Sequence, residues 1–455
     1  MIRVAVTVAL LAASASAQPW NDWRELEAPL LTGHIRLTSP DMFTKAGEAY
    51  FSPDTNWIIF QAVPVPPEGQ EPSPHYAMYV AKLTRDADGA INGIEEPIEL
   101  SGPGSANTCG WFHPTKPGVV LFGSTVEPLV KNEGPGFRVG TEKYSWDFPT
   151  SMNIIEVNIN DIINDGISSE TLAQLPRLVD RPGYDAEGSW SSDGSLVLYA
   201  NVDESKNAES ADADIWIRDL ESGKDIPMVI ADGYDGGPFF NPDDTLICYR
   251  SDRNGDEHLQ LYITEVERDD SGTITGPRRE VQLTDDGHVN WAPFFHPEGG
   301  SLIYTTSHMG HRNYEVFGIE LALDKVHSKR QLRRITLADG FDGLSVFSPD
   351  GRQMMWTSQR NLDGAPGVGS SQVWIATIAD KAGSPAFHSP LDRPQAELLA
   401  IRQAEKDGHK VDPLSIKSEP FRRQWIVTIS PLGTGDPLTY SVTPDGLAEA
   451  MAGGS

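Results

Sequence analysis

The sequence predicts an all-β fold, a six-bladed β-propeller of four-stranded blades, closed by an N-terminal strand and followed by a short α/β C-terminal extension. Three observations support this prediction. A tight turn of the Ser-Pro-Asp-Gly type recurs six times, each time directly after an aromatic residue. Short apolar runs lie on both sides of every turn. A period near 50 residues with several short strands per unit is typical of propellers.

The six copies align on the aromatic residue that precedes the turn. These residues are Phe51, Phe112, Trp190, Phe240, Phe295 and Phe347, with spacings of 61, 78, 50, 55 and 52 residues. In the fourth copy, Pro242 and Asp243 follow Asn241. Proline presets φ at the second position of a turn and aspartate suits the third, so the turn is expected on physical grounds.

Each copy supplies its strands in a fixed order. The first strand ends at the aromatic residue and is apolar at consecutive positions, as an innermost strand covered on both faces should be. Second strands are expected at 57–60, 119–122, 196–199, 246–249, 302–304 and 354–356. Third strands are expected at 76–83, 152–159, 214–220, 259–266, 314–321 and 372–378. Fourth strands are expected at 97–100, 177–179, 227–230, 280–283 and 333–335.

These are only five fourth strands for six copies. Residues 34–38 precede the first copy and are similar to the fourth strands near 282–284 and 334–336. We expect residues 34–38 to pair with the sixth copy, because closing the ring removes a free strand edge that would favour aggregation.

The flanks of the repeats give the domain boundaries. Residues 1–17 have a positive start, a short apolar core and a small-residue cleavage site, which predicts an export leader and a periplasmic or secreted protein. A lead at 18–33 precedes the propeller at 34–379, and a linker rich in Pro, Ser and Ala follows at 380–394.

The remaining residues, 395–455, form the C-terminal extension. A helix is expected at 396–407 and one hairpin from 424–429 and 438–442. No function is predicted for this part of the chain.

Composition excludes two classes of partner. The 455-residue chain has 36 Lys and Arg against 65 Asp and Glu, a formal net charge of −29 at pH 7. Such a surface repels phosphate backbones and anionic lipid, so neither nucleic acid binding nor membrane insertion is expected. Cys109 and Cys248 lie in predicted strands of different repeats. Two buried free thiols are favoured there, with a disulfide as the alternative. The oligomeric state is not predicted.

The turn motif, as in Phe51-Ser52-Pro53-Asp54, resembles the TolB-type WD40-like propeller repeat over roughly residues 34–378. Gly-Tyr-Asp precedes the repeat at 183–185 and 233–235 and resembles an uncharacterised exported bacterial branch of that family. The resemblance implies a partner-binding propeller, as TolB docks to the peptidoglycan-associated lipoprotein. Similar propellers accompany hydrolase domains in exported peptidases. The short lead leaves no room for the α/β domain that TolB carries, so no role in the Tol system is expected.

Polar residues recur five positions before the aromatic residue of each copy. They are Ala46, Asn107, Asp185, Asp235, Asn290 and Asp342, five of the six being Asp or Asn. Glu48 and Glu187 lie two positions further on in their copies. One interpretation is a ring at the channel mouth that binds a cation such as Ca²⁺, sugar hydroxyls or a peptide end. The other is that each side chain caps its own turn.

The loop at 123–151 should lie on the same face of the ring. It carries Tyr144 and Trp146 and is longer than connections usually are, which favours a binding loop or a flap over the channel. His308, His311 and Arg312 lie on a corresponding loop, where the two histidines could hold a metal but have no evident third ligand.

Two arginines follow a second strand on the same side of the ring. Arg250 and Arg253 could pair with the acidic ring or bind an anionic group.

No nucleophile-elbow, zincin or P-loop motif occurs in the sequence. The leading expectation is a scaffold without a cofactor that docks a protein or peptide at the channel-mouth face. The alternative is a carbohydrate-active or hydrolytic enzyme with its site in the channel mouth. Docking requires an open mouth with apolar edges, whereas an enzyme requires a deep pocket where carboxylates or a histidine meet.

Overall fold

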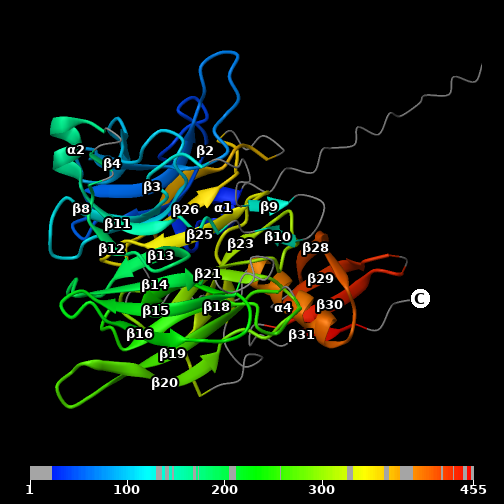
Figure 1. Ribbon diagram of the computed structural model, residues 1–455. Helices are drawn as coiled ribbons and strands as arrows, with labels where there is room; N and C mark the ends of the chain where they lie inside the picture. Colours follow the sequence, from blue (N-terminus) through cyan, green and yellow to red (C-terminus); the bar gives the residue numbers. More distant parts are fainter. Residues whose placement is uncertain are drawn as a thin grey trace, which may run out of the picture.

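The computed structural model describes residues 23–129, 136–138, 143–145, 148–167, 171–172, 174–203, 212–256, 258–324, 332–362, 368–379, 393–421, 424–433, 435–443 and 448–451. The predicted leader and Trp146 lie outside these residues. Within them, six antiparallel sheets follow one another along the chain as the blades, and a further four-stranded sheet belongs to the C-terminal extension (Figure 1).

The blades are numbered in chain order. The first consists of β2 (Phe43–Phe51), β3 (Trp57–Pro64), β4 (Ala77–Arg85) and β5 (Ile91–Ile94), with β6 (Ile98–Glu99) also on β4. The second consists of β7 (Asn107–Phe112), β8 (Val119–Ser124), β11 (Asn153–Asn158) and β12 (Arg177–Val179). The third consists of β13 (Tyr184–Trp190), β14 (Leu196–Val202), β15 (Ala213–Asp219) and β16 (Asp225–Val229).

The fourth blade consists of β17 (Asp235–Phe240), β18 (Leu246–Ser251), β19 (Gln260–Arg268) and β20 (Ile274–Gln282). The fifth consists of β21 (Asn290–Phe295), β22 (Ser301–Thr306), β23 (Glu315–Glu320) and β24 (Leu332–Arg334). The sixth consists of β25 (Asp342–Phe347), β26 (Gln353–Ser358), β27 (Gln372–Ile378) and β1 (Leu31–Arg36). The six-bladed propeller predicted from the repeats is therefore confirmed.

The first strands form the closed inner wall of the ring. Each of β2, β7, β13, β17 and β21 contacts the first strand of the next blade, and β25 contacts β2. Apolar residues of the second and third strands, such as Ile59, Tyr199 and Tyr304, are buried between neighbouring blades. The core is thus divided into layers between blades, and the inner strands surround a central channel.

The recurring turns hold their shape through their own side chains. In the first blade the Ser52 hydroxyl donates to Asp54 at 2.6 Å and accepts from the Trp57 amide at 2.9 Å. Where histidine replaces serine, the imidazole accepts a backbone hydrogen bond in place of the hydroxyl. In the second blade Nδ1 of His113 accepts from the Lys116 amide at 3.1 Å. These contacts explain why the aromatic-turn motif marks every blade.

The N-terminal strand closes the sixth blade, as predicted. β1 pairs antiparallel with β27, with Leu31 opposite Ile378 and Arg36 opposite Trp374. It begins three residues before the expected strand at 34–38. A short helix, α1 (Trp23–Glu27), precedes it and was not expected.

The C-terminal extension is a unit of one helix and one sheet (Figure 1). The sheet contains β28 (Val411–Phe421), β29 (Gln424–Pro431), β30 (Leu438–Val442) and β31 (Ala448–Ala450). Helix α4 (Arg393–Lys406) packs on this sheet and contacts β24. The predicted helix and hairpin are present, but β28 and β31 were not predicted.

Two apolar side chains join the extension to the propeller. Leu398 of α4 packs into the cluster around Leu332, and Met309 of the fifth blade packs into the core of the extension. Other short elements are α2 (Ile159–Asp165) and the hairpin of β9 (Gly136–Arg138) and β10 (Lys143–Ser145). None of the described helices is long and apolar enough to cross a membrane.

Candidate site in the channel mouth

Every first strand carries a bulge at the same position, three residues before the aromatic residue. The residues there all have φ between 48° and 58°: Glu48, Cys109, Glu187, Gly237, Ala292 and Leu344. The left-handed region costs a non-glycine residue roughly 1–2 kcal/mol. Because this conformation nevertheless recurs in all six blades, we infer that the geometry of the ring requires it. Glu48, Cys109, Glu187 and Leu344 line one cavity in the channel.

Glu187 is held by a buried hydrogen-bond network. Its carboxylate accepts from the Tyr234 hydroxyl at 2.6 Å, from Arg250 Nη2 at 3.4 Å and from the Gly237 amide. Arg250 also donates to the Tyr234 hydroxyl at 2.7 Å. A Cβ at Gly237 would overlap the Arg250 guanidinium, so glycine leaves the room in which Arg250 reaches Glu187. Glu187 is therefore fixed as one member of an ion pair.

Glu48 lies in the same layer, and no cationic side chain among the described residues is in direct contact with it. Its Oε1 accepts from the Cys109 thiol at 3.0 Å and from the Tyr50 hydroxyl at 3.4 Å. Burial raises the pKa of Glu48, and the negative charge of Glu187 adds to this effect against the opposing Cys109 hydrogen bond and Arg250 charge. Glu48 therefore keeps its proton to a higher pH than an exposed glutamate.

The two cysteines are free thiols, Cys248 fully buried and Cys109 partly so. Burial raises the pKa of Cys109 well above its ordinary value, and the Glu48 charge raises it further. Because the thiolate is the nucleophilic form, Cys109 is poorly suited to nucleophilic attack at neutral pH.

Aromatic rings close the channel below this layer. In four of the six blades they come from the residue directly before the last aromatic residue of the first strand: Tyr50, Trp111, Phe239 and Phe294. Tyr50 and Trp111 have ring centroids 5.0 Å apart, Trp111 and Phe239 5.4 Å, and Phe239 and Phe294 5.3 Å. The channel therefore has a floor of contacting rings beneath Glu48 and Glu187.

The space above the acidic layer is a cavity of about 1110 Å³. Its walls include the aromatic side chains of Tyr76, Phe148, Tyr184 and Trp291. The extension forms one side of the mouth through Glu405, Val411, Asp412, Pro413 and Leu432. The mouth is therefore a deep pocket partly covered by the extension, and not an open face.

Most of the predicted polar ring faces its own blade. Asp185 accepts from the Arg181 amide at 2.6 Å and from Asn201 at 2.9 Å, and burial raises its pKa to about 7. Asp235 accepts from Arg253 at 2.8 Å, and burial raises its pKa to about 6. Asp185 thus joins its first strand to Asn201 of β14, and Asp235 joins its first strand to Arg253, which follows β18.

The other ring residues have similar local partners. Asp342 accepts from Trp356 Nε1 and Arg360 Nη2, each at 2.9 Å. Asn290 donates to Asp286 at 2.8 Å, and Asn107 accepts from the Ser124 hydroxyl at 2.7 Å. Among the residues that the structure describes, Asn107 is the single Asp or Asn of the predicted ring that lines the cavity. A partner-binding role for the ring stays a prediction.

The predicted loop residues are placed differently. Tyr144 lies in β10, and Phe148, at the end of the same loop, packs against Tyr184 with ring centroids 5.0 Å apart. His308, His311 and Arg312 all line the cavity. His311 contacts the Tyr314 hydroxyl at 3.1 Å, so the two predicted histidines have different neighbours.

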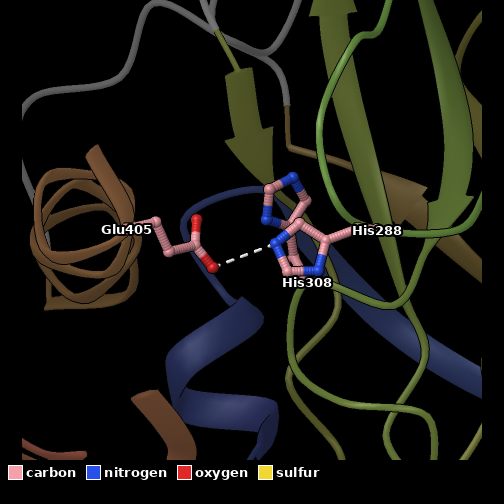
Figure 2. A group of neighbouring side chains, drawn as sticks. All are labelled: His288, His308 and Glu405. Carbon is pink, nitrogen blue, oxygen red and sulfur yellow. Dashed lines mark hydrogen bonds and ion pairs between the residues drawn. The ribbon is translucent and has the colours of Figure 1, made fainter. Parts of the chain in front are cut away.

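His308 lies beside two residues that the sequence analysis did not single out. Its ring centroid is 3.9 Å from that of His288, and His288 Nε2 is 3.0 Å from a Glu405 carboxylate oxygen (Figure 2). Burial opposes protonation of His288, but the Glu405 carboxylate outweighs it and raises the His288 pKa. Glu405 belongs to α4, in the C-terminal extension, for which the sequence predicted no function.

The fold and the cavity define a six-bladed propeller with a blind, acidic channel mouth. No family model matches the chain. It is 28% identical over 118 residues to the uncharacterized peptidase YuxL of Bacillus subtilis (strain 168), covering 26% of this chain and 16% of that protein. It is 26% identical over 133 residues to the uncharacterized protein Atu1656 of Agrobacterium fabrum, covering 29% of this chain and 39% of that protein. The matches thus span less than half of these relatives' lengths.

Among solved structures, the putative TolB from Agrobacterium tumefaciens is similar, with 14% identity and a TM-score of 0.43. The match covers 76% of this chain and 98% of that chain. TolB belongs to the family that the repeats resemble.

Proposed function

We propose that the protein is an exported hydrolytic enzyme that uses Glu48 and Glu187 in the channel mouth on a neutral or cationic ligand, such as an oligosaccharide or a short peptide. The observation that supports it is the pair of carboxylates at equivalent bulges of two blades, both open to one deep cavity. Small-molecule sites usually occupy roughly 300–1,000 Å³, so this cavity suits a ligand of several rings or residues.

The two carboxyl groups suit different roles. Glu48, whose pKa burial raises, would donate its proton to the leaving oxygen or nitrogen. Glu187, held by Arg250 and Tyr234, would act as the carboxylate that accepts the proton of the attacking water. Water adds to the cleaved bond, and the proton taken by Glu187 restores Glu48 through solvent after product release.

Aromatic walls support this ligand class. Tyr76, Phe148 and Trp291 offer flat apolar faces on which sugar rings or apolar side chains can pack. The net charge of −29 and the carboxyl groups in the cavity disfavour polyanionic substrates.

Docking of a folded partner on this face is less well supported. The extension occupies one side of the mouth, with Val411 and Pro413 in the cavity wall. A flexible peptide end could enter the cavity, whereas a broad protein surface would have to displace the extension.

The test is turnover by the purified full chain on chromogenic glycosides and on peptidyl nitroanilides. Glu48→Gln should lower kcat by at least about 100-fold with little change in KM, because a positioned acid contributes 10²–10⁴-fold. Glu187→Gln should also lower kcat. The matched control is Glu95→Gln, whose side chain is 56% exposed in a surface pair with Lys82.

The pH profile gives a second measure. The acid must be protonated, so kcat/KM should fall as pH rises through the raised pKa of Glu48. Equal turnover by Glu48→Gln and the wild type would contradict the proposal. Ligands that raise the melting temperature without being cleaved by the wild type would support the docking alternative.

A further inference from the structure

A second group of side chains also lines the cavity. His288 lies between β20 and β21, His308 follows β22, and Glu405 is in the last turn of α4. One ligand atom from each residue lies within 4.8 Å of the other two. Figure 2 shows the Glu405 carboxylate and a ring nitrogen of each histidine facing one another.

His308 is oriented as a metal-binding histidine would be. It is 2% exposed, and its ring stacks on Phe317 with centroids 5.5 Å apart and planes at 4°. Its Nε2 lies 3.2 Å from an Asp286 carboxylate oxygen. A carboxylate at that nitrogen fixes the N–H there and leaves the Nδ1 lone pair free, as in carboxylate–histidine–zinc arrangements.

The Nδ1 atom of His308 is buried and has no hydrogen-bond partner among the described residues. A buried acceptor without a partner costs roughly 1–3 kcal/mol. Asp286 and Phe317 hold the ring in place although no described residue forms a hydrogen bond with this nitrogen. This is the observation that distinguishes the group from an ordinary ion pair between His288 and Glu405.

We propose that His288, His308 and Glu405 bind one divalent transition-metal ion, with Zn²⁺ as the best match. Two imidazoles and one carboxylate suit Zn²⁺, whereas Ca²⁺ and Mg²⁺ prefer oxygen ligands alone. Zn–ligand bonds are about 2.0–2.2 Å, which places tetrahedral ligand atoms roughly 3.4 Å apart. Atoms already within 4.8 Å of one another need shifts of the order of 1 Å to reach that geometry.

The site would be open to the cavity. All three residues line it, so three protein ligands leave a coordination position for water or a ligand on the cavity side. The ion would also connect the extension to the fifth blade, because Glu405 is the one ligand supplied by α4. This inference does not depend on the proposed acid–base role of Glu48, since metal binding is measured directly.

The experiment is Zn²⁺ titration by calorimetry on untagged full-length protein after removal of metals with EDTA, with metal content measured by mass spectrometry. The wild type should bind one Zn²⁺ per chain. His308→Ala and His288→Ala should weaken binding at least about 100-fold, and Asp286→Asn about tenfold. His311→Ala is the matched control, because His311 lies three residues from His308 and contacts Tyr314 instead.

Co²⁺ gives an independent readout, because a tetrahedral site produces a characteristic visible spectrum that His308→Ala should abolish. Should His308→Ala fail to fold in EDTA, Glu405→Gln replaces it, since that side chain is 32% exposed and its shape is kept. Stoichiometric Zn²⁺ binding that both Glu405→Gln and His288→Ala leave unchanged would overturn the proposal. Failure of the wild type to bind Zn²⁺ or Co²⁺ would overturn it as well.

Discussion

Glu27 is the residue that best explains how the N-terminal lead is attached to the ring, and its carboxylate makes the contacts. It is fully buried and accepts from Arg360 Nη1 at 3.0 Å and from Arg360 Nη2 at 3.1 Å. It also accepts from the Leu337 amide at 2.7 Å and contacts His34 at 2.7 Å. Burial alone would raise the pKa of Glu27, but the Arg360 charge and these contacts hold it below the ordinary value.

Glu27→Gln should therefore lower the free energy of unfolding by about 3 kcal/mol at pH 7, because it removes one charge from a buried pair. The stabilisation by Glu27 is present above its unfolded pKa, near 4.5, and is lost as pH falls through the lower folded pKa. Urea unfolding at pH 7 and below pH 4 measures the difference between the two proteins. Glu25→Gln, at an exposed position of the same helix, is the control. A difference that stays constant with pH would contradict this explanation.

At the scale of single elements, β1 is the strand on which ring closure depends. Its pairing with β27 is extended by Leu37 and Thr38, whose backbone and hydroxyl bond to Val373 and Gln372. Without β1 the outer edge of β27 would be free.

A chain that begins at Ser39 should aggregate or lose much of its melting temperature, because it lacks β1 and the Glu27–Arg360 pair. A chain that begins at Trp23 keeps both and serves as the control. Light scattering and thermal unfolding of the two proteins compare them directly. Equal melting temperatures would show that the sixth blade is stable without its fourth strand.

The strands and turns of the blades could be predicted because each copy repeats the same local chemistry. The direction in which the side chains of the predicted polar ring face could not be predicted. A bulge three residues before each aromatic residue breaks the alternation of side chains, so Glu48 and Glu187 face the channel while Asp185 faces Asn201. β28 was missed because Pro413 and Pro420 and charged residues interrupt its apolar pattern.

At the scale of the whole molecule, the extension forms one side of the channel mouth and partly covers it. The propeller has its own closed inner wall, and the extension is attached through Leu398, Met309 and the contacts of Glu405. The proposed metal-binding group could not be predicted, because Glu405 lies 117 residues after His288 and the sequence does not show that α4 returns to the mouth.

Removal of residues 380–455 should leave a propeller that unfolds cooperatively. Its stability should fall by about 2–3 kcal/mol, the value of burying one large apolar side chain such as Leu398. High-affinity Zn²⁺ binding should be lost with Glu405. Calorimetric unfolding and Zn²⁺ titration of the truncated chain test both effects, with Leu432→Ala in the full chain as a control, because this side chain is 62% exposed. Failure of the truncated chain to fold would show that the extension is part of the core.

The closure by β1 also sets the order in which the molecule can assemble. Each of the first five sheets is built from neighbouring stretches of sequence, whereas the sixth pairs β1, which precedes the first blade, with β27, the last of the predicted third strands. During synthesis β1 is made before β27 and stays unpaired until β27 has been made. Its late pairing carries the largest loop-closure cost in the chain, so the ring should form last and in a single step. Until then β1, although it is made before all six inner strands, is among the last strands to fold.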